Sequence, residues 1–363
     1  MKIKNRLVVA PMTHLGSNED GTLGEQERCF IGNRANDMGM FILAATLVQD
    51  GGKAFYGQPE VIHASQLPSL KETANIIKAQ GAKAILQIHH GGKQAITELL
   101  NGKDKISASA DEATGTREAT AAEVRSLIAA FGHATDLAIQ AGFDGVEIHG
   151  ANNYLIQQFY SGHSNRRTDE WGGSRENRMR FPLAVVDAVL SAKAKHNAND
   201  FIVGYRFSPE EPEELGITME DTFALIDALK EKSLQYLHIS LWDFYKKARR
   251  GADTNAHRLQ LVHERIGGKL PLIGVGNLYT PDEILAAFNT GWAEFIALGK
   301  TVMVNPDIAT RILNGEENNI QRSVDPDQAD HYGFPDLLWD STMSGTQAWL
   351  PPLKGQKSNI LDI

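Results

Sequence analysis

GVEIHGANNYLIQQFYSGHSNRRTDEWGGSRENRMRFP, residues 145–182, is the stretch that decides the fold of this chain. A short apolar run ends in His149, a long polar loop follows, and a helix is expected to begin near Ser174. This order of strand, loop and helix is one unit of a parallel α/β fold. His149, Asn152 and Tyr154 directly follow the carboxyl end of the strand, where side chains can converge on a bound molecule.

The composition indicates a folded protein with one large domain or two. Of the 363 residues, 42% are apolar and 22% are charged, so a sizeable core is expected. The net charge of -9 argues against nucleic acid as a partner, because binding phosphates requires a surplus of Lys and Arg. Cys29 is the only cysteine, which excludes an internal disulfide and a cysteine-ligated iron–sulfur cluster within this chain.

The apolar segments are too short for a membrane protein. None approaches the ~20 residues that a helix needs to cross a bilayer. The N-terminus, MKIKNRLVVAPM, is basic but lacks an apolar core followed by a small-residue cleavage site. We therefore expect a cytoplasmic protein with no membrane partner.

The strand–helix unit recurs along the chain. Continuous apolar strands are expected where helices cover a sheet on both faces. The expected strands are 6–12, 40–46, 84–89, 145–149, 201–207, 236–240, 271–276 and 293–298. The expected helices are 24–38, 68–80, 120–141, 174–196, 218–231, 255–266 and 281–289. Ser174 and Thr218 stand at N-cap positions, and Pro281 suits a first helical turn.

Eight such units predict a (β/α)₈ barrel over residues 1–313, with a doubly wound sheet as the alternative. Residues 314–363 form a C-terminal extension that contains Trp339, Trp349 and two adjacent prolines and has no clear period. We expect this extension to pack on the barrel or on a partner subunit, and therefore expect a homo-oligomer.

Polar residues and glycines gather at the ends of several different strands. They are Thr13, Gln87, His89, His90, His149, Arg206, Gly276, Asn277, Gly299 and Lys300. The loops after the seventh and eighth strands of such barrels often bind phosphate, because glycines let backbone N–H groups approach an anion. The glycines at 274 and 276 lack the third glycine of a Rossmann fingerprint.

Each of these residues also has a purely structural interpretation. Arg206 could pair with a buried carboxylate, Gln87 could be a hydrogen-bonded core amide, and Tyr154 could serve packing. The adjacent His89 and His90 raise the question of a metal, but no acidic residue accompanies them at ligand spacing, so no metal is expected. Their shared position on one rim favours the functional interpretation.

Three segments resemble the Old Yellow Enzyme family of FMN-dependent ene-reductases and NADH:flavin oxidoreductases. They are NRLVVAPMT (5–13), EIHGANNYL (147–155) and the highly specific SNRRTDEWGGSRENR (164–178), within a resemblance that spans roughly 5–314. The resemblance implies FMN as cofactor, NAD(P)H as reductant and ping-pong turnover. It also implies hydride transfer from flavin N5 to the β-carbon of a small electron acceptor, such as an enone, a nitroalkene or a quinone-like molecule.

The resemblance further implies a role for each matching position. The residues implied to contact the flavin ring are Ala10, Pro11, Met12, Thr13, Ala45, Gln87 and Arg206. Those implied to hold its phosphate are Gly276, Asn277, Gly299 and Lys300. His149 and Asn152 would bind the carbonyl oxygen of the acceptor, and Tyr154 would donate a proton to its α-carbon. Many relatives have arginine where Lys300 stands, and lysine lacks the bidentate fork.

The sequence departs from the family pattern in two ways, and two other functions stay open. Relatives usually carry a hairpin ahead of the first strand, whereas this strand begins almost at Met1; the hairpin is absent, replaced by another segment, or encoded upstream. The tail is longer than in compact members of the family. The alternative functions are a metal-dependent hydrolase on the same barrel, suggested by His89, His90 and His149, and a flavin-binding oxidoreductase without ene-reductase chemistry.

Overall fold

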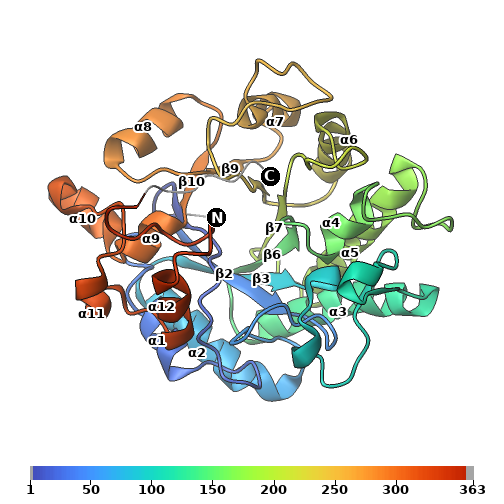
Figure 1. Cartoon of the computed structure of the whole chain (residues 1–363), viewed down its shortest axis with the longest axis horizontal. Coiled ribbons are helices and arrows are strands. Elements are labelled where there is room, and N and C mark those ends of the chain that lie inside the picture. Colours follow the sequence, from blue (N-terminus) through green and yellow to red (C-terminus); the bar gives the residue numbers. More distant parts are fainter. Residues whose placement is uncertain (1–2, 357–363) are drawn as a thin grey trace.

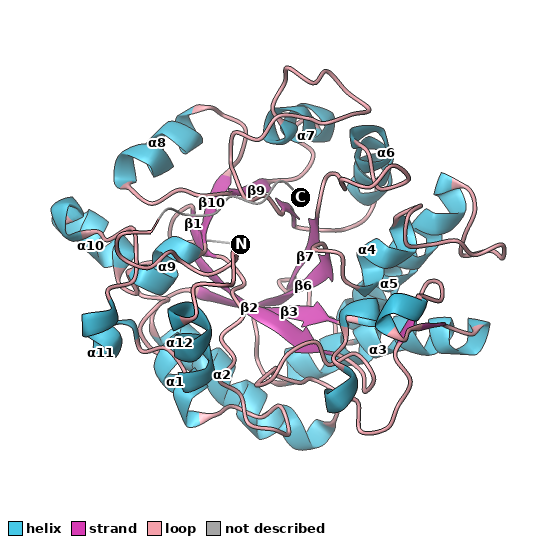
Figure 2. Cartoon of the chain, viewed as in Figure 1, coloured by secondary structure: helices cyan, strands magenta, loops and turns pink. Residues whose placement is uncertain are grey.

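Eight parallel strands close into a barrel at the centre of the computed structural model, and helices surround them, as Figure 1 and Figure 2 show. The structure describes residues 3–356. Each strand pairs with the barrel strands that precede and follow it in the chain, and β10 pairs with β1 to close the ring. The barrel strands are β1 (Leu7–Val9), β2 (Met40–Leu47), β3 (Lys83–His89), β6 (Gly145–Gly150), β7 (Ile202–Phe207), β8 (Tyr236–Ile239), β9 (Leu272–Val275) and β10 (Phe295–Leu298).

A helix follows each barrel strand and lies outside the ring (Figure 2). These helices are α1 (Glu25–Ile31), α2 (Leu67–Ala79), α3 (Ala121–Gln140), α5 (Arg175–Lys195), α6 (Met219–Lys230), α7 (Arg258–Ile266), α8 (Pro281–Asn289) and α10 (Ile308–Asn314). Four further helices are α4 (Leu155–Tyr160), α9 (Lys300–Val304), α11 (Ala329–Tyr332) and α12 (Asp336–Met343). A small parallel sheet of β4 (Ile106–Ser107) and β5 (Arg117–Glu118) lies in the loop after β3.

Short 3₁₀ turns complete the connections. They are η1 (Ala64–Gln66), η2 (Gly92–Gln94), η3 (Thr97–Leu99), η4 (Glu112–Thr114), η5 (Glu317–Asn319) and η6 (Pro326–Gln328). Within residues 3–356, no helix has the length and apolar character needed to cross a membrane.

The predicted barrel is confirmed, and the doubly wound alternative is excluded because the sheet closes. All eight strands lie where the sequence predicts them, but β1 ends at Val9 rather than at residue 12. Ala10 N–H still donates to Leu298 O at 3.0 Å, and Pro11 then has no N–H to continue the ladder. Helix α1 ends at Ile31, seven positions earlier than predicted, and the short helix α4 was not predicted.

The helix-start signals act as predicted. Thr218 Oγ1 accepts a hydrogen bond from Asp221 N–H, and the Asp221 side chain accepts one in return from the Thr218 backbone. Ser174 accepts from Asn177 N–H, and Pro281 occupies the first turn of α8. Each such bond satisfies a backbone donor that the helix itself leaves without a partner.

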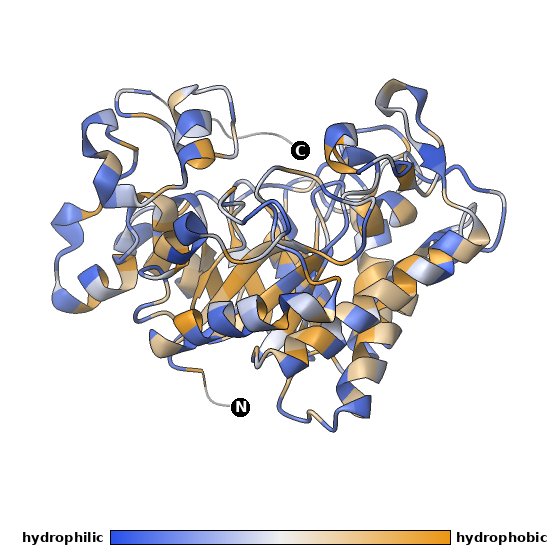
Figure 3. Cartoon of the chain, turned by 90° about the horizontal axis from the view of Figure 1, so that it is seen from below, coloured by the Kyte–Doolittle hydropathy of each residue, from blue (hydrophilic) through white to orange (hydrophobic). Residues whose placement is uncertain are grey.

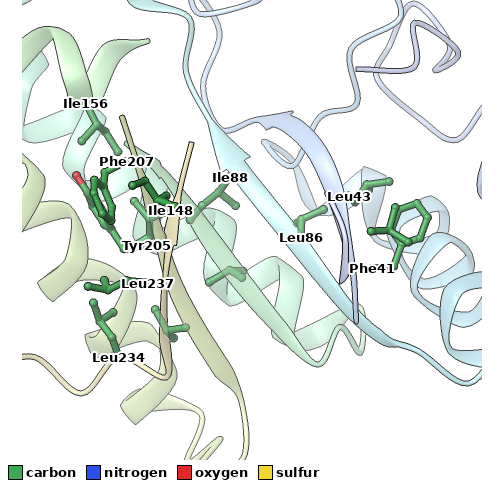
Figure 4. Packing of buried hydrophobic residues seen from close by; sticks show 14 of the residues in the cluster. Phe41, Leu43, Leu86, Ile88, Ile148, Ile156, Tyr205, Phe207, Leu234 and Leu237 are labelled. Carbon is green, nitrogen blue, oxygen red and sulfur yellow. The ribbon is translucent and has the colours of Figure 1, made fainter. Parts of the chain in front are cut away.

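Alternate residues of every strand face the barrel interior, and the two sets have different chemistry. The outward set packs against the helices, as Figure 4 shows for Leu43, Leu86, Ile148 and Phe207. In the side view of Figure 3, the strands form an apolar centre beneath more polar loops. The inward apolar layer is Val8, Ala10, Met40, Ile42, Ile85, Ile202, Tyr236, Ile273, Val275 and Ala297. Toward the carboxyl ends of β3, β6, β7 and β8, the inward positions become Gln87, Glu147, Arg206 and His238.

The run 164–178, which we call the clamp, fastens the long loop after β6 to its surroundings. Arg167 is buried, and its guanidinium donates to the backbone carbonyls of Ala108 at 3.0 Å and Ala119 at 2.7 Å. The same guanidinium pairs with Asp169, with Nη2 and Oδ2 2.6 Å apart. The arginine therefore joins the loop after β6 to the loop after β3.

Two further side chains of the clamp bind backbone carbonyls. Asn165 Nδ2 donates to Phe159 O at 2.6 Å and to Trp171 O at 2.7 Å. Arg178 Nε donates to Tyr160 O at 2.8 Å, which ties helix α5 to the end of α4. The side chains of the most specific sequence motif thus stabilise the surrounding backbone by hydrogen bonds to its carbonyl groups.

The C-terminal extension lies against α1, so α12 and α1 appear together in Figure 1. The buried guanidinium of Arg34 donates to the carbonyls of Phe30 and Tyr332 and lies 3.8 Å from the Phe30 ring centroid. Gln26 Nε2 donates to Asp336 Oδ2 at 2.7 Å. The predicted division between residues 1–313 and 314–363 falls at the last residues of α10 and stays a prediction; residues 357–363 lie outside the described part.

Candidate active site

Three rings meet at the carboxyl ends of β3 and β6. The ring centroids of His149 and Tyr154 are 5.2 Å apart, and those of His89 and Tyr154 are 4.3 Å apart in an edge-on arrangement. Asn152 stands between His149 and Tyr154 in the chain, with a left-handed backbone at φ 58°. The predicted acceptor site is therefore brought together in space. We call His89, His149, Asn152 and Tyr154 the rim.

The protonation state of His149 follows from its surroundings. Burial, followed by the nearby His89 and Arg206, lowers the pKa of His149 well below its ordinary value, so the ring is neutral at pH 7. Its Nδ1 accepts the backbone N–H of Ala151 at 3.3 Å. A neutral ring has one proton, so that proton is on Nε2, where it is available for donation.

Tyr154 combines a protonated hydroxyl with a fixed position. It is the N-cap residue of α4, with an extended backbone at φ -85° and ψ 179°. Burial raises the pKa of its hydroxyl above the ordinary value near 10. The group therefore remains an O–H donor throughout the neutral range.

His89 was considered above only as a metal ligand, and the structure gives it another role. Gln58 Nε2 lies 3.0 Å from His89 Nδ1, and Gln58 Oε1 is occupied by the N–H of Ala54 at 2.8 Å. The amide therefore donates to Nδ1, which places the His89 proton on Nε2. That buried nitrogen has no partner among the described residues. Gln58, which is fully buried, was missed by the sequence analysis.

Gln87 and Ala45 are also brought together as predicted. A shift of register between Leu43 and Thr46 interrupts the pairing of β2 with β3. At this point Ala45 N–H donates to Gln87 Oε1 at 3.1 Å. Gln87 Nε2 donates in turn to Glu147 Oε1 at 2.8 Å, so both ends of the amide are fixed.

Glu147 is the centre of a buried polar network that the sequence analysis did not assign. Its Oε2 accepts from Tyr236 Oη at 3.0 Å and pairs with His238 Nδ1 at 2.9 Å. Burial opposes ionisation, but His238, followed by the charge of Arg206 and the hydrogen bond from Gln87, brings the pKa of Glu147 below its ordinary value. Burial also lowers the pKa of His238, so we assign a neutral ring that donates its Nδ1–H to the carboxylate.

The missed network had a recognisable signal in the sequence. Glu147 and His238 are ionisable residues inside apolar strands, at the inward positions of a period of two. Gly204 makes the packing possible, because a Cβ there would lie 2.0 Å from the Tyr236 ring. We call Gln87, Glu147, Arg206, Tyr236 and His238 the polar bed.

Arg206 lies at the edge of the polar bed that faces the rim. It is buried and donates from Nη2 to Ser240 Oγ at 3.1 Å, whereas its Nε has no partner among the described residues. No ion pair joins it directly to Glu147 within 4.0 Å in the described part of the chain. The charges of Arg206 and the buried Glu147 still interact, so the structural interpretation of Arg206 stays open beside the functional one.

The predicted phosphate residues lie on the loops after β9 and β10. Gly276 has φ 142°, and a Cβ there would come within 2.4 Å of Phe244 N, so the position requires glycine. Asn277 continues in a left-handed conformation at φ 52°. Gly299 precedes Lys300, whose ammonium lies 5.2 Å from the Trp242 ring centroid and 2.8 Å from Ala348 O. Burial lowers the pKa of Lys300 to about 8.

The segment after β1 completes the lining. Ala10, Met12 and Gly299 border a small internal cavity of about 10 Å³ together with the buried His14 and Arg34. A Cβ on Gly299 would lie 2.9 Å from Met12 Sδ, so the methionine packs on the glycine. Pro11 and Thr13 lie on the same segment and are partly exposed.

The residues present fit FMN. The buried Arg206 Nε and His238 Nε2 have no partner among the described residues, so a donor and an acceptor remain for the polar edge of a ring system. The glycine backbone at 276 and the ammonium of Lys300 suit a phosphate. A metal fits less well, because residues 3–356 hold no group of three or more His, Cys, Asp or Glu side chains able to bind one.

Comparison with known sequences gives a consistent result. A family model described as the NADH:flavin oxidoreductase / NADH oxidase family matches residues 1–319. A probable NADH-dependent flavin oxidoreductase of Bacillus subtilis, YqiG, is 48% identical over 352 residues, which cover 96% of this chain and 94% of that protein. An NADH:fumarate oxidoreductase of Klebsiella pneumoniae is 38% identical over 348 residues, which cover 93% of this chain but 37% of that longer protein.

Comparison with solved structures extends this similarity to three dimensions. The structure of morphinone reductase in complex with tetrahydroNAD has a TM-score of 0.77 at 27% identity. The match covers 92% of this chain and 94% of morphinone reductase. The barrel and its order of elements are therefore shared with an enzyme that has been solved with a nicotinamide analogue.

Proposed function

The chain belongs to the NADH:flavin oxidoreductase family of Old Yellow Enzyme type, with FMN as cofactor and NADH as reductant, and we propose that it reduces activated alkenes. The observation that carries this proposal is the rim. It places the Nε2–H of His149, the amide of Asn152 and the hydroxyl of Tyr154 at one strand end, each with a proton to donate. Three donors in one place suit an acceptor that gains negative charge on oxygen and then a proton on carbon.

His149 and Asn152 bind the carbonyl or nitro oxygen of the acceptor in this proposal. Their hydrogen bonds strengthen as that oxygen gains charge, and one such donor is typically worth about 3 kcal/mol of activation free energy. His149 is suited to this role because burial keeps it neutral with the proton on Nε2. A neutral donor also remains compatible with the nearby positive charge of Arg206.

Tyr154 supplies the proton that the α-carbon receives. Its raised pKa keeps the hydroxyl protonated until the step in which it is needed. Its ring is held edge-on against His89 and at the start of α4, so the hydroxyl has a defined position. Once the proton has left, the neighbouring Nε2–H groups of His89 and His149 can stabilise the phenolate.

The polar bed and the glycine loops hold the cofactor in this proposal. FMN, when bound, supplies hydride exchange with NADH and with the alkene. Arg206 would supply a fixed positive charge to the polar edge of the bound ring, and Gln87 and Ala45 would contact the ring. The ring contacts are assigned to Ala10, Pro11, Met12, Thr13, Ala45, Gln87 and Arg206, and the phosphate contacts to Gly276, Asn277, Gly299 and Lys300.

The test is anaerobic stopped-flow with FMN-loaded protein. NADH and NADPH are compared as reductants, and cyclohexenone, a nitroalkene and a quinone are compared as acceptors. We expect the double variant His149→Ala/Asn152→Ala to lose at least a hundredfold in enone turnover while it retains FMN. Unchanged enone turnover in that variant would refute the proposed oxygen site, and the absence of any alkene reduction by the wild type would refute the proposed reaction.

A second candidate is transfer of electrons from NADH to an acceptor other than an alkene, such as free flavin. The name of the Bacillus subtilis relative, which is similar over almost the whole chain, favours this candidate. Its signature is rapid oxidation of NADH with added FMN and none with the alkene panel. The double variant separates the candidates, because electron transfer to free flavin does not require the oxygen site.

A further inference from the structure

Ser240 lies between the polar bed and the rim. It directly follows β8, and its backbone N–H donates to Phe207 O at 2.8 Å, which fixes its position beside β7. Its hydroxyl oxygen lies 3.1 Å from Arg206 Nη2 and 2.7 Å from Asn152 Oδ1. One hydroxyl therefore joins the buried cation to the amide of the proposed oxygen site.

The direction of this chain of hydrogen bonds is determined by chemistry. A guanidinium has only donors, so Arg206 must donate to Ser240 Oγ. The single hydroxyl proton of Ser240 is then directed to Asn152. The structure places Asn152 Oδ1 against this hydroxyl, so the proton is donated to the amide oxygen, and Asn152 Nδ2 with its two protons is turned to the opposite side.

The amide needs such a constraint because little else holds it. Asn152 lies exposed on a left-handed turn, where its backbone N–H donates to Ser208 Oγ at 2.9 Å and its carbonyl accepts from Gln94 Nε2 at 2.9 Å. These bonds position the backbone. Within residues 3–356, Ser240 provides the hydrogen bond that the Asn152 side chain makes.

If the Asn152 amide were rotated by 180°, the proposed oxygen site would lose a hydrogen-bond donor. The two ends of an asparagine amide have nearly the same shape but opposite hydrogen-bonding character. If the oxygen faced the acceptor, a lone pair would oppose the developing negative charge instead of a donor stabilising it. Sequence alone gave no indication of this constraint, because β6 and β8 are separated by the whole of β7.

We propose that Ser240 is a positioning residue that holds the Asn152 amide with its N–H₂ toward the acceptor oxygen. This inference rests on the proposed function and deepens it, since it explains how one of the two oxygen donors is oriented. The guanidinium of Arg206 takes part by donating to one of the two lone pairs of the hydroxyl oxygen, which helps to fix the position of the hydroxyl. Ser240 itself contacts neither the reacting atoms nor the acceptor.

The kinetic test compares Ser240→Ala with Ser240→Thr in the FMN-loaded enzyme. We expect Ser240→Ala to lower kcat/KM for cyclohexenone about tenfold, because the donor is lost in part of the population. Ser240→Thr keeps a hydroxyl and should restore most of the activity. Oxidation of the reduced enzyme by ferricyanide requires no oxygen site and should be unchanged in both variants, as should the dissociation constant of FMN.

A double-mutant cycle identifies the residue through which Ser240 acts. In an Asn152→Ala background, Ser240→Ala should cause no further loss, because the amide that it orients is absent. Ser208→Ala is the matched control: it removes a hydroxyl from the Asn152 backbone, and its smaller loss should persist in the same background. A loss from Ser240→Ala that persists without Asn152, or a matching loss of FMN affinity, would overturn the inference.

Neutron crystal structures of the wild type and Ser240→Ala, in which the deuterated amide nitrogen is distinct from the oxygen, give a readout that does not depend on turnover. We expect one amide rotamer at Asn152 in the wild type, and two rotamers or a rotated amide in the variant. An unchanged, fully occupied rotamer in the variant would overturn the inference. A wild type that fails to reduce any alkene would refute the proposed reaction instead, and the rotamers would still decide the role of Ser240.

Discussion

The clamp lies in the loop after β6 and the rim lies at the carboxyl ends of β3 and β6, and these two polar regions differ in how completely their side chains are partnered. In the clamp, Asn165, Arg167 and Arg178 donate to backbone carbonyls that would otherwise lack partners. Its one buried polar side-chain atom without a partner, among the described residues, is Trp171 Nε1. In the rim and the polar bed, by contrast, His89 Nε2, Arg206 Nε and His238 Nε2 are buried without one.

This difference shows that the residues of the family motif and the residues proposed for the chemistry are separate sets. A dense set of side chain–backbone bonds tolerates few substitutions, which gives the clamp its specific sequence. Unpartnered buried polar atoms reduce stability and are retained where a ligand can satisfy them. The sequence run that identifies the family most strongly is therefore structural, and the chemistry lies beside it.

The sharpest test makes the same substitution at the two ends of α4, once at the rim and once in the interior. Tyr154→Phe removes the proposed proton donor, and no hydrogen bond of that hydroxyl is found in residues 3–356. We expect alkene turnover to fall at least a hundredfold, because general-acid catalysis typically contributes 10²–10⁴-fold. The free energy of unfolding, measured by urea denaturation, should stay within about 0.5 kcal/mol of the wild type.

Tyr160→Phe is the matched control for that variant. The Tyr160 hydroxyl is at the other end of α4 and donates to Asp221 O at 2.5 Å in the interior. Its loss should cost about 1–2 kcal/mol of stability and leave turnover per folded molecule unchanged. If Tyr154→Phe and Tyr160→Phe had the same effects on turnover and stability, the proposed difference between the rim and the interior end of α4 would be refuted.

Arg167→Met should have the largest effect on stability. It leaves the carbonyls of Ala108 and Ala119 without their donor, and we expect a loss of about 3 kcal/mol in the free energy of unfolding. Arg166→Met is the control, because that side chain is adjacent, identical and exposed, and should change stability by less than about 1 kcal/mol. Thermal unfolding of both variants measures the difference, and equal melting temperatures would contradict the assignment of the clamp.

Glu147→Gln tests the polar bed, which contains both hydrogen-bonded and unpartnered side chains. The amide has about the same shape but cannot accept all three hydrogen bonds, so we expect a loss of about 2 kcal/mol at pH 7. The pKa of Glu147 is lowered in the folded state, so its ionised form stabilises the protein above the ordinary carboxyl pKa near 4.5. This stabilisation is lost as the pH falls through the folded-state pKa.

The difference between wild type and Glu147→Gln should therefore be constant from pH 6 to 8 and shrink in acid. Urea denaturation as a function of pH measures it. A difference that instead grew toward low pH would mean that Glu147 is protonated in the folded protein at neutral pH.

The smallest expected effect concerns the phosphate loop. Burial lowers the pKa of Lys300 to about 8, and binding the phosphate requires the ammonium form. FMN affinity should therefore weaken as the pH rises through 8, by about tenfold at pH 9, because the free enzyme is by then mostly deprotonated. Fluorescence titration with FMN at each pH gives the affinity.

Lys300→Arg supplies the control, because a guanidinium stays charged over the same range. Its FMN affinity should not depend on pH between 7 and 9. An equal decline in both proteins would place the titrating group elsewhere and would remove Lys300 from the phosphate site.

The sequence was sufficient for the barrel and for most of the strand-end residues, and the reason is local. Strand runs, caps and loop insertions are visible within short windows, so His149, Gln87 and Arg206 could be placed on one rim before any coordinates were known. The partners of Glu147 and Ser240 come from strands that are not adjacent in the chain. They become visible only when the register of β6, β7 and β8 is fixed.

The extension illustrates another limit of sequence patterns. Its helices α11 and α12 are short, and their packing depends on the buried Arg34 in a distant part of the chain. A lone arginine near α1 gives no sequence indication that its partner is 298 positions away. The likeness of the first 319 residues to the family model does not reach this contact.

The bond between Arg34 and the Tyr332 carbonyl has a consequence for how the protein is made. The arginine leaves the ribosome long before its acceptor does, so a nascent barrel carries a guanidinium that must stay hydrated. The region around α1 can therefore lose its water only after synthesis has passed α11.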